Sequence, residues 1–118
     1  MKIKAIAAST FFDFDNQYNF SKSALKELAE TAANLPLYLN QEKIGVVESG
    51  SLLDEKLIIT AKVENKDKVN DKGLYLAPGG LTDYETNGDI LQRCKAHRYT
   101  LTDSPNDKTL TPFEEVEP

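Results

Sequence analysis

Residues 35–63 read LPLYLNQEKIGVVESGSLLDEKLIITAKV, and this stretch decides the fold. Leu57 to Val63 alternates apolar residues with a second set of side chains, which is the pattern of a strand with one buried face. Ile44 to Glu48 is another apolar run, and Ser49-Gly50-Ser51 after it indicates a turn. We therefore expect these two runs to pair as a β-hairpin, preceded by an extended segment from Leu37 to Leu39.

The residues before this stretch predict one amphipathic helix. Ser21 is a suitable N-cap, because its hydroxyl can accept a hydrogen bond from a free backbone N–H one turn inside the helix. Lysine and glutamate cover one side of the segment. The apolar residues that share the other side are Ala24, Leu25, Leu28, Ala32 and Leu35. Pro36 ends the pattern, so we expect the helix from Ser21 to Asn34 to pack against the sheet.

Further strands are expected on both sides of the helix and hairpin. At the start, Ile3, Ala5 and Ala7 share one face of an extended segment. Gly73 to Ala77 is a short strand stopped by Pro78-Gly79-Gly80, where the glycine pair indicates a backbone bend that a side chain would block.

The last third of the sequence gives a weaker pattern. Asp83 to Asp89 reads as a polar turn region. Ile90 to Thr102 fits either a helix or a strand, and the β-formers Tyr99, Thr100 and Thr102 favour a strand from Cys94 onward.

These elements predict a mainly β (α+β) fold, either a small β-barrel or a strongly bent antiparallel sheet with one packed helix. A chain of 118 residues has room for one hydrophobic core. We expect residues 1–103 to form a single compact β-rich domain. Residues 104–118 are expected to be an extended tail, docked at most by Leu110 and Phe113.

Composition argues against several classes of function. The formal net charge is −5 and the lysines are interrupted by acidic residues, so no basic surface for nucleic acid is expected. The apolar runs are too short to span a bilayer. The first residues lack the pattern of a signal peptide, so we expect the protein to be made and kept in cytoplasm.

Residues that could carry chemistry are sparse. One cysteine and one histidine cannot form a zinc site within one subunit. Cys94 and His97 would share a face on a helix but oppose each other on a strand, so a nucleophile and base pair would require the helix. Asp13 and Asp15 point the same way on a strand, and we interpret them as a solvated face rather than a calcium site. We expect no catalytic residue, no metal and no cofactor.

Two parts of the chain resemble the phage prohead (head maturation) protease family. LPLYLNQEKIGVV at residues 35–47, a turn at Gly50 and the strand LIITAKV at residues 57–63 are similar to the opening half of that family. YTLTDSPNDKTLTP at residues 99–112 resembles its closing strand, where an apolar-Ser/Thr-apolar stretch leads into a proline turn. Together these segments cover roughly a third of the chain.

The departures from that family concern its catalytic residues. Where the family pattern would place a histidine, this chain has Asn40-Gln41, and neither amide accepts a proton at neutral pH. The strand GLYLAPGG at residues 73–80 has no serine where the nucleophile would be expected. The resemblance therefore implies a β-barrel-like scaffold in a phage head context, without the family's chemistry.

From this resemblance we expect a non-enzymatic phage virion structural or head-assembly protein that acts through protein contacts. It would be a capsid cement or decoration protein, or a protease-like pseudoenzyme, and would bind the major capsid protein or another virion protein. We expect a homo-oligomer found in the host cytoplasm during assembly and then in the virion. It would bind neither nucleic acid nor membrane.

The candidate interface surrounds the glycine bend. Its members are Tyr75, Leu76, Pro78, Leu81 and Tyr84. Their aromatic and aliphatic side chains could fill a partner's pocket, or they could simply close the core.

Two other functions stay open from the sequence. One is a serine hydrolase or prohead protease-like enzyme that uses His97 with Ser104. The other is a small regulator or inhibitor that binds a host protein.

Overall fold

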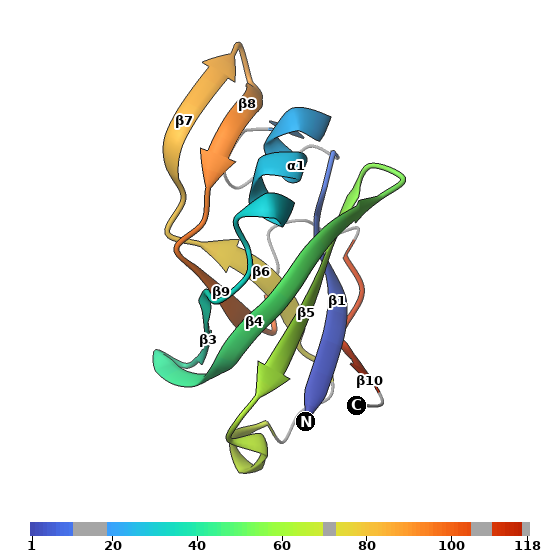
Figure 1. Cartoon of the computed structure of the whole chain (residues 1–118), viewed down its shortest axis with the longest axis vertical. Coiled ribbons are helices and arrows are strands. Elements are labelled where there is room, and N and C mark those ends of the chain that lie inside the picture. The colour runs from blue at the N-terminus through green and yellow to red at the C-terminus, as the bar shows by residue number, and fades with distance from the viewer. Residues whose placement is uncertain (11–18, 70–72, 105–109, 117–118) are drawn as a thin grey trace.

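The computed structural model describes residues 1–10, 19–69, 73–104 and 110–116. It is mainly β with one α-helix, and its larger sheet is strongly curled into a half-barrel against which the helix packs (Figure 1). The predicted fold class is confirmed.

The larger sheet has seven strands. In spatial order they are β10 (Glu114–Val116), β1 (Lys2–Ser9), β5 (Lys56–Val63), β4 (Glu42–Leu53), β3 (Pro36–Leu39), β9 (Arg98–Thr102) and β6 (Tyr75–Gly79). All neighbours are antiparallel except β3 and β9, which are parallel.

A smaller sheet lies over one end of the larger one. Its order is β2 (Asn19–Phe20), β8 (Ile90–Lys95) and β7 (Thr82–Asn87). Helix α1 (Lys22–Glu30) lies between the two sheets and contacts β4, β5 and β8 (Figure 1). A short 3₁₀ helix, η1 (Lys66–Lys68), follows β5.

The curl of the larger sheet encloses the core. Strands β1 and β6 contact each other, although four strands separate them in the hydrogen-bonded order. The backbone N–H of Phe113, just before β10, donates to the carbonyl of Leu74, just before β6, at 3.0 Å. The largest fully buried side chains include Tyr99, Leu25 and Leu28, so the helix and β9 both contribute to one core.

The predicted hairpin forms, but its turn lies elsewhere. Strands β4 and β5 pair with Val47 opposite Ala61, as expected for the two apolar runs. The predicted turn at Ser49-Gly50-Ser51 is wrong, because β4 continues through these residues to Leu53. The chain turns at Asp54-Glu55, whose φ angles of 50° and 65° suit a tight hairpin turn.

Gly50 is needed for packing rather than for a turn. A side chain there would bring a Cβ within 2.9 Å of the Ala29 carbonyl oxygen of helix α1. The glycine therefore lets the helix lie directly on β4, and sequence pattern alone does not separate this use of glycine from a turn.

Helix α1 starts as predicted and ends early. The Ser21 hydroxyl accepts a hydrogen bond from the Ala24 N–H at 3.1 Å, which confirms the N-cap. The predicted end at Asn34 is wrong, because the helix stops at Glu30. Asn34 adopts a φ of 72° and its N–H donates to the Val47 carbonyl, so the chain turns back to pair with β4 before Pro36.

The strands on either side of the glycine pair form one long bent hairpin. Strands β6 and β9 pair below the bend, and β7 and β8 pair above it. Gly80 has a φ of 62°, and a Cβ there would lie 2.8 Å from an Arg98 side-chain nitrogen. The predicted bend at Gly79-Gly80 is confirmed.

The predicted polar turn at Asp83 to Asp89 is mostly wrong. Residues Thr82 to Asn87 form strand β7, and only the next two residues make a turn. Pairing with β8 supplies the hydrogen bonds of this strand, so it forms without an apolar face. Ile90 to Cys94, left open between helix and strand, is strand β8.

The last described residues dock on the sheet. Leu110 and Phe113 are buried, at 8% and 6% exposure, as expected for the two docking residues. Glu114 to Val116 also form strand β10, which pairs with β1 and was not predicted.

Candidate functional site

The structure does not bring the five predicted interface residues onto one surface. Strand β6 alternates its side chains between two faces, so Tyr75 is partly exposed whereas Leu76 is fully buried. Leu76 as an interface residue is wrong, because its side chain belongs to the core. Leu81 is partly buried against the core, and the side chain of Tyr84 lies outside the described residues.

His97 and Ser104 lie beyond opposite ends of strand β9. His97 Nε2 is 2.8 Å from the hydroxyl oxygen of Thr82, whereas the Ser104 hydroxyl donates to a carboxylate oxygen of Asp103 at 3.3 Å. The intervening strand separates them by about 20 Å at the usual rise per residue. They cannot share a proton, so the geometry excludes this pair as a catalytic unit.

Cys94 and His97 are separated in the same way by burial. The Cys94 side chain is fully buried on β8, while His97 is exposed at the bend between β8 and β9. Burial, with a smaller contribution from the Glu27 carboxylate, raises the pKa of the Cys94 thiol to about 11. A neutral buried thiol is a poor nucleophile.

The segments that correspond to the resembled family's base and nucleophile lie close together. Asn40 and Gln41 form the turn between β3 and β4, and GLYLAPGG includes β6. Strand β9 pairs with β3 on one side and β6 on the other, which places Tyr38, Thr100 and Ala77 in one cross-strand row. None of these three side chains is a base at neutral pH.

Asn40 and Gln41 have a structural explanation. Their φ angles are 52° and 67°, which is the left-handed region that a two-residue hairpin turn requires. Asparagine tolerates this region better than most residues. The amide at position 40 therefore suits the turn.

A cavity of about 460 Å³ opens beside this turn. Its apolar lining comes from Leu39, Leu74 and Leu101, and its polar lining includes Lys68 and Asp103. Lys68 also pairs with Glu42 at 3.6 Å. The cavity thus offers charges of both signs in its described lining and favours no one ligand class.

Metal and membrane binding find little support in the part of the chain that the structure describes. No group of three or more His, Cys, Asp or Glu side chains there could hold a metal ion. Helix α1 falls far short of the length needed to cross a bilayer, and no other described helix is longer. Asp13 and Asp15 lie outside the described residues.

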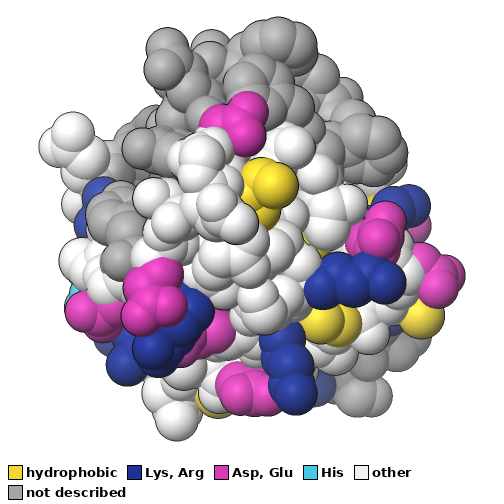
Figure 2. Space-filling model, turned by 90° about the horizontal axis from the view of Figure 1, so that it is seen from above, with side chains coloured by type: hydrophobic (Ala, Val, Ile, Leu, Met, Phe, Trp, Pro, Cys, Tyr) yellow, Lys and Arg dark blue, Asp and Glu magenta, His cyan; other side chains and the backbone are white. Residues whose placement is uncertain are grey.

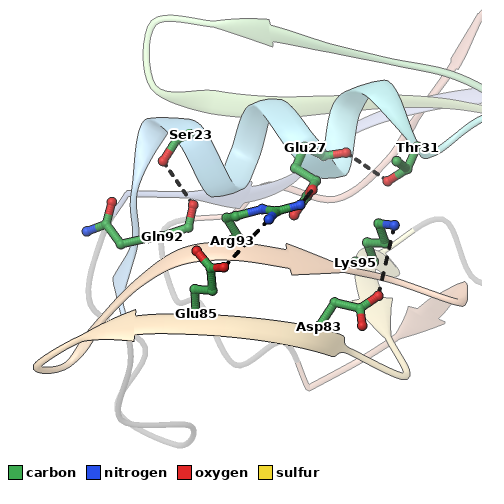
Figure 3. Close-up of polar contacts among 8 residues, drawn as sticks. All are labelled: Ser23, Glu27, Thr31, Asp83, Glu85, Gln92, Arg93 and Lys95. Atoms are coloured by element: carbon green, nitrogen blue, oxygen red, sulfur yellow. Dashed lines mark hydrogen bonds and ion pairs between the residues drawn. The ribbon is translucent and has the colours of Figure 1, made fainter.

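An ion-pair network ties the β7–β8 hairpin, which we call the arm, to helix α1. Arg93 on β8 contacts Glu27 of the helix at 3.0 Å and Glu85 of β7 at 3.6 Å (Figure 3). The Ser23 hydroxyl adds a hydrogen bond to the Gln92 carbonyl at 2.9 Å. The hydrogen bond to Glu27 raises the pKa of the Arg93 guanidinium, so the network stays charged.

The arm exposes nearly all of its own surface. Every residue of β7 with a described side chain is exposed, and so are Gly88, Asp89 and Ile90 at the tip. The second projecting hairpin, β4–β5, ends in Leu52 and Leu53, which are 38% and 60% exposed. Both tips point to the same end of the molecule (Figure 1).

The view onto this end shows separate apolar spots among charged side chains (Figure 2). Sequence reasoning missed both tips as surfaces. The signal was present in SGSLLDEK at residues 49–56, where two leucines directly precede a polar turn and so lie beyond the core.

Comparison with known proteins gives no relative: no protein-family model, no curated protein and no solved structure matches the chain.

Proposed function

We propose that this protein is a non-enzymatic phage virion structural or head-assembly protein. It acts as a capsid cement or decoration protein, or as a protease-like pseudoenzyme, through contacts with the major capsid protein or another virion protein. It works as a homo-oligomer, in the host cytoplasm during assembly and then in the virion.

The observation that carries the proposal is the β7–β8 arm. A contact surface binds best when it is exposed yet held in one conformation, because little freedom is then lost on binding. The arm meets both conditions, since its outer strand is exposed and Arg93 fixes it to Glu27 and Glu85.

The second support is the set of residues at the turn and strands that correspond to the resembled family's catalytic segments. Asn40 serves a left-handed turn, and the neighbouring row holds Tyr38, Thr100 and Ala77. This scaffold fits a function in which binding has replaced catalysis.

The direct test is co-sedimentation of the purified protein with heads of the phage that carries its gene. The native protein should bind in a regular copy number. Ile90→Asp, at the exposed tip of the arm, should weaken binding, because it places a charge in the contact. Thr111→Asp, which adds the same charge at an exposed residue away from the arm, should bind like the native protein. A native protein that ignores heads would contradict the proposal and favour the regulator of a host protein.

The enzyme alternative has its own test. A serine-reactive probe should label neither Ser51 nor Ser104, and the protein should show no peptidase or esterase turnover. Stoichiometric labelling that is abolished by His97→Ala would instead establish a serine hydrolase.

A further inference from the structure

The outer half of strand β4 is an open sheet edge. On the side away from β5, β4 pairs with β3 up to Val46, and Val47 bonds to the turn residues Asn34 and Leu35. Beyond Val47, the described residues make no backbone hydrogen bond to this side of β4. We call Ser49–Leu53 the free edge.

The other outer strands are protected against pairing with another chain. Strand β10 is three residues long and carries Glu114 and Glu115. Strand β7 has register shifts, acidic side chains and a φ of 57° at Asp83. Strand β6 contains Pro78, which has no N–H to donate, and it contacts β1. Short length, charge, bulges and proline are the features by which proteins block edge pairing.

The free edge has none of these features. Ser49 to Leu53 contains no charged residue, no proline and no left-handed φ angle. Its pairing with β5 is regular from Ser49 onward, so its backbone is extended. Leu52 and Leu53 are exposed on it. An edge of this kind is a template for another strand.

We propose that two copies of this protein pair antiparallel through their free edges, around a two-fold axis at Ser51. Opposite residues in an antiparallel pair share a face, so a two-fold axis at Ser51 sets Leu52 against the partner copy's Gly50. It likewise sets Leu53 against the partner copy's Ser49. Each large side chain then meets a small one, and the two Ser51 residues meet at the axis.

Charge selects a second copy as the occupant and this edge as the place. Each copy carries a net charge of −5, so most surfaces of two copies repel each other. The free edge brings five uncharged residues from each copy together. At its end, Glu48 approaches the partner copy's Asp54, and Lys2, which lies 3.2 Å from Glu48, offsets that repulsion.

This inference deepens the proposed function, because it names the surface of the homo-oligomer, and its meaning for the virion rests on that proposal. The paired edges would join the two larger sheets into one continuous sheet. The dimer would present two arms to a capsid lattice.

The test exploits the symmetry of the axis. Sedimentation velocity over a concentration series should show native protein shifting from monomer to dimer. Ser51→Lys places two like charges opposite each other and should raise the dimer Kd about fivefold or more. Ser51→Glu alone should do the same. An equimolar mixture of the two variants should restore the dimer, because lysine then faces glutamate.

Controls separate this inference from misfolding and from the proposed function. Thr111→Lys should dimerise like native protein, and circular dichroism should show that each variant is folded. Leu53→Lys, at the most exposed of the large apolar residues, replaces Ser51→Lys if the latter does not fold.

Native protein that stays monomeric, or a mixture that does not recover, overturns the edge pairing. Phage heads that bind the monomer would leave the proposed function standing in that case. A native dimer that ignores phage heads would overturn the proposed function alone.

Discussion

At the scale of single residues, the backbone explains several side chains that suggest chemistry. Asn34 and Asn40 both occupy the left-handed region, at turns that lead into and out of strand β3. Gly45, in the Ile-Gly pair of the resembled segment, lies where β4 crosses closely over Lys62 of β5. Each residue type is explained by local geometry before any catalytic role is needed.

Gly45→Ala should destabilise the fold more than Gly88→Ala. A Cβ at Gly45 would collide with the backbone carbonyl oxygen of Lys62, which cannot move without disturbing the sheet. We expect a loss of about 1–3 kcal/mol or more, as for overpacking of a core. Gly88 has a φ of 65° but open space around it. Alanine there should cost about 1 kcal/mol through the left-handed φ. Equal losses in urea unfolding would show that the β4–β5 crossing is not tight.

The buried thiol of Cys94 should make the protein less stable at alkaline pH. Its pKa is raised from the ordinary value of 9.0 to about 11 in the folded protein. As pH rises above 9, the unfolded chain loses this proton first, so stability falls until the folded thiol also ionises near pH 11. The full loss is about 2–3 kcal/mol.

Urea unfolding at about pH 8 and about pH 10.5 measures this loss. Cys94→Ala should show a smaller difference between the two conditions than native protein does. Tyr99, whose phenol pKa is also raised by burial, is unchanged in that comparison. An identical pH dependence in both proteins would mean that the thiol reaches solvent.

At the scale of elements, helix α1 joins the two sheets. Its apolar side places Leu25 and Leu28 in the core, and its polar side holds the arm through Glu27 and Ser23. The arm therefore depends on the helix for its position. Capping at Ser21 and packing at Gly50 determine where the helix lies.

Leu28→Ala should destabilise the protein by about 2–5 kcal/mol, because the side chain is 1% exposed and its removal leaves a cavity. Lys26→Ala, on the exposed side of the same helix, should change stability by about 0.5 kcal/mol or less. Thermal or urea unfolding gives both values. A loss at Leu28 as small as that at Lys26 would show that the apolar side of the helix does not pack on the sheet.

At the scale of the whole molecule, the residues after β9 complete the half-barrel. Phe113 is buried, and its N–H reaches the Leu74 carbonyl beside the opposite edge of the larger sheet. Strand β10 then covers the outer side of β1. The end of the described chain thus contributes to the same core as its beginning.

Phe113→Ala should therefore destabilise the whole protein, by about 3–5 kcal/mol. Thr111→Ala, at an exposed neighbour, should leave stability within about 0.5 kcal/mol of native. Unfolding should remain a single cooperative transition in both variants. If Phe113→Ala unfolds at the native urea concentration, the residues from 110 onward are a dispensable tail.

The sequence by itself determined the β-rich class, the single helix with its Ser21 cap, the pairing of the β4 and β5 apolar runs, and the bend at Gly79-Gly80. These features depend on side-chain periodicity and on local backbone requirements, which neighbouring residues already specify. Only the tertiary structure decided that Gly50 lies within a strand, that the polar residues of β7 pair, and that Leu76 faces the core.

The physical reason is that a strand or helix ends where its backbone groups find other partners. Those partners are distant in sequence: Asn34 bonds to Val47, and Phe113 bonds to Leu74. The same holds for the surfaces proposed for binding. A stretch such as Ser49–Leu53 becomes an open edge only because β3 ends before it can cover the second half of β4.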